Sequence, residues 1–174
     1  MVTLKGKNIY LRALESEDLE FLYELENNES VWEVSNTTAP YSKFILKQYL
    51  ENSYKDIFEA KQLRLVICVS DSDKPIGCVD LFDFDPFHLR AGVGVLIDAQ
   101  YRDVGLAKEA LLLLEFYSFN DLNINQLHCN ISVKNIRSVG LFKSCGYQIT
   151  GELKSWLKTQ NTFDNVLFLQ KLNN

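Results

Sequence analysis

Residues 91–119 read AGVGVLIDAQYRDVGLAKEALLLLEFYSF, and the organisation of the whole chain can be worked out from this segment. Its first part, residues 91–97, is apolar and rich in Val, which predicts a strand buried on both faces. From residue 106 onward the apolar side chains recur at the spacing of one helix face. They are Leu106, Ala110, Leu113, Leu114 and Tyr117. The segment therefore predicts a strand, a short loop and a long helix in direct succession.

The loop between strand and helix is suited to an anionic ligand. The first N–H groups of a helix have no partner within the helix, and the helix dipole favours negative charge at that end. Gly105 has no Cβ and lets a ligand approach the backbone, while Arg102 adds a positive charge. The loop lacks the Gly-Lys-Ser/Thr of a P-loop, and the glycines of the strand do not complete a dinucleotide fingerprint. We therefore predict a phosphate or pyrophosphate site of another kind.

Two glycines interrupt the predicted strand itself. Gly92 and Gly94 would weaken a strand unless they mark a bulge or the close approach of another group. We infer that this strand leaves part of its ladder unpaired and offers backbone groups to a ligand. Residues 127–133, LHCNISV, predict the neighbouring strand, and the two together would form a V-shaped opening.

Two motifs then resemble the acyl-CoA signature of a known family. Arg102, Gly105 and Ala107 match Arg/Gln-x-x-Gly-x-Gly/Ala. The second motif is Asn-x-x-Ser/Ala-x-x-Leu-Tyr/Phe-x-x-x-Gly-Phe/Tyr. It is matched in register by Asn135, Ser138, Leu141, Phe142, Gly146 and Tyr147. The chain thus resembles the GCN5-related N-acetyltransferases, the GNAT family, and is nearest to their polyamine and ribosomal-protein acetyltransferase branches.

The resemblance implies a mixed α/β fold: a strongly twisted mixed sheet, helices on both faces, and a V-shaped splay between the two central strands. It also implies that acetyl-CoA binds with its pantetheine arm in the splay and its pyrophosphate at the start of the long helix. The implied cofactor-binding residues are Val95, Leu96, Ile97, Arg102, Asp103, Val104, Gly105, Leu106, Ala107, Lys108, Asn135, Ser138 and Phe142. For Asn135, helix N-capping alone is the alternative.

Acetyl transfer to an amine needs a group that takes the amine proton. The candidates are Asp80, Asp83, Asp85, His88 and Glu33. Strand alternation predicts that Asp80 and Asp83 lie on opposite faces of the sheet. Asp85 precedes a proline and can equally be a turn former, and His88 can equally be a hydrogen-bonded structural residue. Family members often carry a Glu near the position of Gly92; this chain does not, so the identity of the base stays open.

The acceptor region is expected in residues 29–41, an irregular segment before a helix capped by Ser42. That helix would present Phe44, Ile45, Tyr49 and Leu50. The resemblance implies that this region closes over the acceptor, which makes Trp32, Glu33 and Asn36 candidate substrate contacts, together with Asp85. The alternatives are a core anchor for Trp32 and a solvated side chain for Glu33.

The main departure from the family is Phe142. Relatives often have Tyr there, whose hydroxyl protonates the leaving CoA thiolate, and Phe has no such proton. Water can replace it, because a thiol of pKa ~8.5 leaves without much help. A neighbour such as Ser144, Cys145 or Tyr147 is a second option. The third is that activity is lost, which would make the chain a non-catalytic acyl-CoA-binding sensor module.

The composition is that of a globular chain, with 174 residues, 47% hydrophobic and 24% charged, and predicts a single domain over residues 1–174. A net charge of −5 argues against a nucleic-acid partner, and no segment approaches the ~20 apolar residues of a membrane span. The four cysteines have no paired spacing, so we expect free thiols in a reducing cytoplasm and no metal site.

The resulting hypothesis is an acetyl-CoA-dependent N-acetyltransferase that moves an acetyl group to a primary amine by direct attack in a ternary complex. The amine is expected to be a small polyamine-like molecule or a protein N-terminus, and the acidic residues 80–85 favour a cationic one. A homodimer is implied by the resemblance alone.

Overall fold

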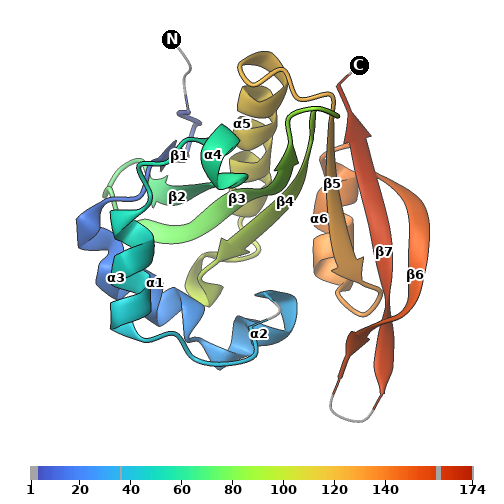
Figure 1. The fold of residues 1–174 in the computed structure, drawn as a ribbon, viewed down its shortest axis with the longest axis horizontal. Helices are drawn as coiled ribbons and strands as arrows, with labels where there is room; N and C mark the ends of the chain where they lie inside the picture. Colours follow the sequence, from blue (N-terminus) through green and yellow to red (C-terminus); the bar gives the residue numbers. More distant parts are fainter. Residues whose placement is uncertain (1–3, 36, 160–161, 174) are drawn as a thin grey trace.

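The computed structural model describes residues 4–35, 37–159 and 162–173. Within these residues the strands form one mixed sheet in the order β1-β2-β3-β4-β5-β7-β6 (Figure 1). The strands are β1 (Ile9–Arg12), β2 (Leu63–Val69), β3 (Pro75–Asp85), β4 (Arg90–Ile97), β5 (Gln126–Ser132), β6 (Gln148–Lys158) and β7 (Phe163–Leu172). Neighbouring strands pair antiparallel except β4 and β5, which pair parallel.

Helices cover both faces of this sheet, with α1, α2 and α3 in front of it and α5 and α6 behind it in Figure 1. The helices are α1 (Leu19–Glu26), α2 (Glu29–Ser35), α3 (Lys43–Glu51), α4 (Ile57–Ala60), α5 (Leu106–Asn120) and α6 (Ile136–Ser144). The predicted strand, loop and helix of residues 91–119 are therefore β4, its loop and α5. The predicted mixed sheet with helices on both faces is confirmed.

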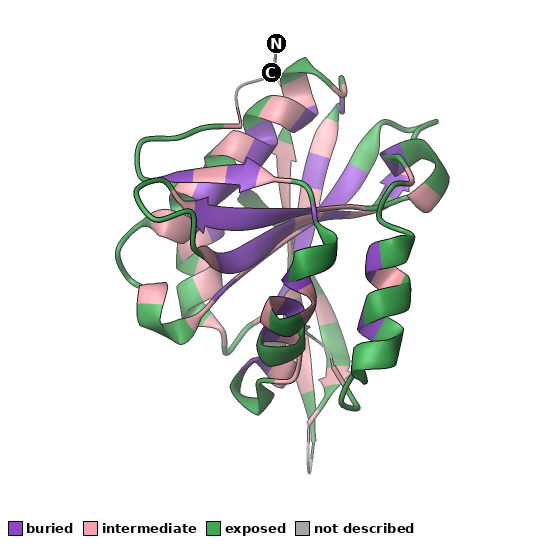
Figure 2. Ribbon diagram, turned by 90° about the vertical axis from the view of Figure 1, so that its left-hand side faces the viewer, coloured by how far each residue is buried: buried purple, intermediate pink, exposed green. Residues whose placement is uncertain are grey.

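Buried residues lie mainly in the sheet and on the helix sides that face it (Figure 2). On one face, Leu111 and Leu114 of α5 belong to the same buried cluster as Leu81, Val93 and Leu127 of the strands. A second cluster joins α1 and α3 to the other face; its buried members include Leu22, Leu46, Leu50, Val66 and Cys78. Burial of this kind stabilises by roughly 25 cal/mol per Å² of apolar surface.

One prediction about the N-terminal half was wrong, and one was confirmed. Residues 29–35 form the helix α2, because no Gly or Pro interrupts them and Glu29 places a negative charge at the helix start. In α3, Ser42 does cap the helix and accepts a hydrogen bond from the Ile45 N–H. Of the apolar residues on this helix, Leu46 and Leu50 are buried, whereas Phe44 and Ile45 are 67% and 48% exposed.

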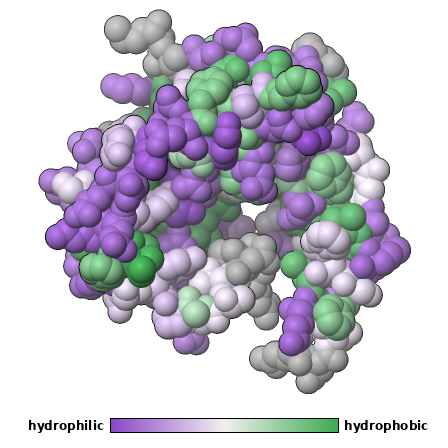
Figure 3. Space-filling view, viewed as in Figure 1, coloured by the Kyte–Doolittle hydropathy of each residue, from purple (hydrophilic) through white to green (hydrophobic). Residues whose placement is uncertain are grey.

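The predicted V-shaped opening between β4 and β5 is confirmed. The two strands pair only at Arg90 with Gln126, Ala91 with Leu127, and Gly92 with His128. Beyond Gly92, β4 keeps its pairing with β3, while β5 continues beside β7. Figure 3 shows the resulting hollow between the two halves of the molecule.

Candidate active site

The open end of the splay carries the loop predicted to hold pyrophosphate. Gly105 is the N-cap of α5 with φ of 87°, and no side chain caps the first N–H groups of the helix. A Cβ at Gly105 would meet no atom within 4 Å, so the approach to these N–H groups is open. The Arg102 Nε donates a hydrogen bond to the Ile97 carbonyl at 2.8 Å and ties the loop to the end of β4. The geometry fits a phosphate group at the helix start.

The same loop is joined to α6, on the other side of the opening. Asp103 forms an ion pair with Arg137, and both side chains are exposed. Val104 is exposed as well, and Leu106 and Ala107 are partly buried against the core. The loop thus lies between the two helices that begin beside the open end of the splay.

Asn135 is the N-cap of α6, and its Oδ1 accepts a hydrogen bond from the Ser138 N–H at 3.1 Å. Phe142, near the other end of α6, is buried and packs edge-on against Tyr147 at 5.0 Å between ring centroids. The Phe142 ring therefore contributes packing of α6 against the core.

Replacing Asn135 by Ala is expected to lower the free energy of unfolding by about 1 kcal/mol, because the α6 cap is lost. Urea unfolding of Asn135→Ala and Asn135→Ser measures this, since Ser keeps a capping oxygen. If Asn135 also contacts acetyl-CoA, Asn135→Ser will restore stability without restoring acetyl-CoA affinity. Unchanged stability in Asn135→Ala would contradict the capping role.

None of the three side chains considered as substitutes for the missing Tyr is suited to give up a proton. The Ser144 hydroxyl donates to the Leu141 carbonyl at 2.8 Å. Burial and the nearby Glu115 carboxylate raise the pKa of the Cys145 thiol and that of the Tyr147 phenol, so both hold their protons tightly. These groups are poor acids for a departing thiolate.

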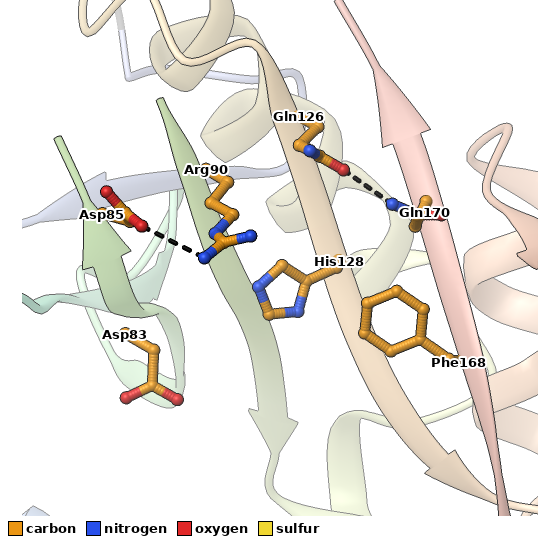
Figure 4. A pocket seen from close by; sticks show the side chains of 7 residues that line it. All are labelled: Asp83, Asp85, Arg90, Gln126, His128, Phe168 and Gln170. Atoms are coloured by element: carbon orange, nitrogen blue, oxygen red, sulfur yellow. Dashed lines mark hydrogen bonds and ion pairs between the residues drawn. The ribbon is translucent and has the colours of Figure 1, made fainter. Parts of the chain in front are cut away.

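A pocket of about 480 Å³ lies where β4 and β5 meet, at the closed end of the splay (Figure 4). Its lining residues are Asp83, Asp85, Arg90, Gln126, His128, Phe168 and Gln170. Sequence reasoning identified Asp83 and Asp85 but missed His128, because an isolated His in an apolar strand gives no sign of its neighbours. The sequence did offer one sign of a role for His128, because the residue lies in a strand that was predicted to border the opening.

The two carboxylates of the pocket differ in their contacts. Asp85 accepts hydrogen bonds from the N–H groups of Phe87 and His88 and pairs with Arg90 at 3.1 Å, so it acts as the turn former. These contacts, led by the His88 N–H, lower the pKa of Asp85. Asp83 makes no hydrogen bond or ion pair within the described part of the chain.

The prediction that Asp80 and Asp83 lie on opposite faces was wrong. The register of β3 against β4 shifts between Phe82 and Asp85, and Asp83 adopts a left-handed backbone with φ of 48°. This bulge breaks the alternation of side chains. Asp83 consequently lines a pocket together with His128, on the face that also carries Asp80.

Asp80 is held in an ion-pair network rather than left free. The Arg64 Nε donates to Asp80 at 2.6 Å, and the Arg64 Nη1 donates to Glu26 of α1 at 2.5 Å. The network fixes α1 to β2 and β3 on the face of the pocket.

His88 and Trp32 do not line this pocket. His88 is exposed in the turn before β4 and packs edge-on against Phe87. The Trp32 Nε1 donates to the Glu26 carbonyl at 3.0 Å, so Trp32 links α2 to α1. The side chain of Glu33 and all of Asn36 lie outside the described residues.

The family model described as acetyltransferase (GNAT) domain matches residues 8–148. The chain belongs to the GNAT acetyltransferase family. It is 31% identical to the spermidine N(1)-acetyltransferase of Escherichia coli (strain K12), over 84% of this chain and 76% of the relative. The spermidine N(1)-acetyltransferase of Vibrio cholerae is also 31% identical, over 85% of this chain and 83% of the relative.

Solved structures show the same GNAT fold. The spermidine N-acetyltransferase from Vibrio cholerae in complex with CoA and spermine matches with a TM-score of 0.88 and 24% identity, over 97% of both chains. A dodecameric structure of the spermidine N-acetyltransferase from Vibrio cholerae matches with a TM-score of 0.81 and 27% identity, over 97% of this chain and 95% of that one.

This GNAT chain is therefore an N-acetyltransferase that uses acetyl-CoA. Acetyl-CoA supplies a thioester that is open to attack by an amine. The residues of the chain fit it: the uncapped start of α5 suits the pyrophosphate, and the β4 backbone from Val95 to Ile97 has no partner strand on the side of β5.

Proposed function

We propose that this acetyltransferase moves the acetyl group to a primary amine of a polyamine. The observation that carries the proposal is the Asp83 carboxylate, which lines the pocket at the closed end of the splay without a partner among the described residues. A polyamine carries a second ammonium group that such a carboxylate can pair with. The names of the relatives and the net charge of −5 agree with a polycationic acceptor.

In this proposal the chain contributes mainly by position. The β4 backbone holds the thioester beside the amine, which converts a bimolecular reaction into an effectively unimolecular one. Backbone N–H groups of the unpaired part of β4 polarise the thioester carbonyl. Solvent water protonates the leaving thiolate, since Ser144 is hydrogen-bonded to a backbone carbonyl and the raised pKa values of Cys145 and Tyr147 keep their protons in place.

The experiment is acetyl transfer from isotope-labelled acetyl-CoA to a pool of spermidine, spermine, N-terminal peptides and amino sugars, read by mass spectrometry. This readout avoids thiol reagents, with which the four cysteines would react. Labelled acetyl-spermidine or acetyl-spermine as the main product supports the proposal. A labelled peptide or amino sugar in its place, or no labelled product, overturns it.

Asp83→Asn is expected to lower kcat/KM for spermidine about threefold to fivefold while leaving kcat/KM for a simple alkyl monoamine unchanged, because only the polyamine has a second charge to pair with the exposed carboxylate. Steady-state assays with both amines measure the difference. Asp121→Asn makes the same change in net charge at the exposed end of α5 and serves as the control. An equal loss for both amines in Asp83→Asn would contradict the ammonium site.

We also propose that copies of the chain associate, at least as a homodimer. We further propose that residues 1–174 form a single domain and that the enzyme works in the cytoplasm. The relative with a dodecameric structure supports association, and so do the exposed Trp156 and Phe163 on the β6–β7 hairpin. Four buried free thiols are consistent with a reducing compartment. None of the described helices is long and apolar enough to cross a membrane. Light scattering on the purified protein tests the association.

A further inference from the structure

The closed end of the splay is the place where the acetyl group must be delivered if acetyl-CoA binds as proposed. β4 runs from Gly92 at the closed end to Ile97 at the open end, and the loop with Gly105 follows directly. A ligand with its pyrophosphate at Gly105 and its arm along the unpaired β4 backbone therefore ends near Gly92. The residue paired with Gly92 across the splay is His128.

A side chain at position 92 would require the Phe82 ring to move. A Cβ on Gly92 would lie 2.3 Å from the Phe82 ring, which already fills that space. His128 is the residue beside it on β5, and because paired residues project to the same face, its ring occupies the neighbouring position. Figure 4 shows the imidazole pointing into the pocket, with Asp83 and Arg90 on one side of it and Phe168 on the other.

The surroundings of the imidazole are those of a proton acceptor. Its Nδ1 is buried without a hydrogen-bond partner among the described residues, whereas Nε2 is not one of these buried atoms and is therefore the nitrogen that can accept a proton. The ring stacks on Phe168 at 5.4 Å between centroids. Burial and the Arg90 guanidinium lower the pKa of His128, and the Asp83 carboxylate opposes them. Asp85 is the other charged group of the pocket, while Gln126 and Gln170 are neutral. A neutral imidazole at neutral pH is the form that accepts a proton.

We propose that His128 is the general base of the acetyl transfer; this role rests on the proposed function. The neutral amine nitrogen forms a bond to the acetyl carbon, and the bond between that carbon and the CoA sulfur breaks. The imidazole takes the proton that the nitrogen loses and passes it through solvent to the sulfur. The products are the N-acetyl amine and CoA thiol, so atoms and charge balance. His128 then serves in place of the Glu that this chain lacks near Gly92.

His128→Gln and His128→Phe test the role with full-length protein, since Phe keeps the stacked ring and removes the proton acceptor. Each is expected to lower kcat with spermidine about 100-fold, within the usual contribution of acid–base catalysis, with KM for acetyl-CoA changed less than about twofold. In the wild type, kcat/KM should fall as the pH drops through the pKa of His128, which lies below the ordinary histidine value of 6.5. This decline at low pH, the acidic limb of the pH profile, should be absent from both variants. His128→Glu should recover part of the activity, with the limb at lower pH.

The chain has two histidines, so His88→Gln is a matched comparison. It should keep the acidic limb, since His88 lies outside the pocket lining. In NMR titration, the imidazole signal that disappears in His128→Gln should titrate below the ordinary range.

The possible outcomes separate the two proposals. A wild type that acetylates no polyamine ends the proposed function and the His128 role with it. A wild type that acetylates spermidine while His128→Phe keeps full kcat, or while His88→Gln removes the acidic limb, overturns only the role of His128. Acetyl-CoA binding by each variant, measured by calorimetry, shows that a loss of kcat reflects chemistry in a folded protein.

Discussion

Gly105→Asp is expected to abolish measurable acetyl-CoA binding while leaving the fold intact. The carboxylate would stand at the open N-terminus of α5, where a Cβ meets no neighbouring atom. At about 5 Å and an effective dielectric constant of about 20, two like charges repel by about 3 kcal/mol, which is more than 100-fold in affinity. Calorimetric titration with acetyl-CoA measures the loss, and circular dichroism checks the fold.

The matched control is Gly105→Asn. Asn has the shape of Asp without its charge, and it tolerates the left-handed backbone that Gly105 adopts at φ of 87° better than most residues. It should therefore retain much of the affinity. If Gly105→Asp binds acetyl-CoA tightly, the pyrophosphate site lies elsewhere. If Asn and Asp lose affinity equally, backbone strain rather than charge is the cause.

Arg64→Leu is expected to lower the free energy of unfolding by about 3–5 kcal/mol, the range for removing one partner of a buried ion pair. Arg64 lies between Asp80 and Glu26, whose side chains are only 20% and 11% exposed. Without the guanidinium, two negative charges remain close together and poorly hydrated. Urea unfolding at neutral pH measures the change.

Lys43→Leu is the comparison for Arg64→Leu. Lys43 pairs with Glu20 at 2.6 Å, but both side chains are largely exposed, and such pairs contribute little. Its removal should leave the unfolding midpoint unchanged. A loss of less than 1 kcal/mol in Arg64→Leu would show that water reaches the network and screens it.

The order of strand, loop and helix in residues 91–119 was predictable because each signal is local. The apolar period changes from that of a strand to that of a helix at Leu106, and Gly105 supplies the left-handed residue between them. The splay was predictable for a related reason, since two glycines in one strand weaken its pairing. The error at α2 arose because a helix of seven residues has too few turns for its apolar period to be recognised.

The catalytic end of the site depended on contacts that no local pattern contains. His128 lies beside Gly92 only through the register of two strands that are separated by α5, and Arg64 joins Glu26 to Asp80 across three elements. Asp83 turns into the pocket because of a bulge that the β3–β4 register imposes. By itself the sequence determined the strand, loop and helix of residues 91–119 and the opening beside the strand, because short-range periodicity and glycine positions specify them, while the resemblance to the GNAT family implied the mixed sheet. Only the tertiary structure decided which acids and bases meet, because strand register and packing place those side chains together.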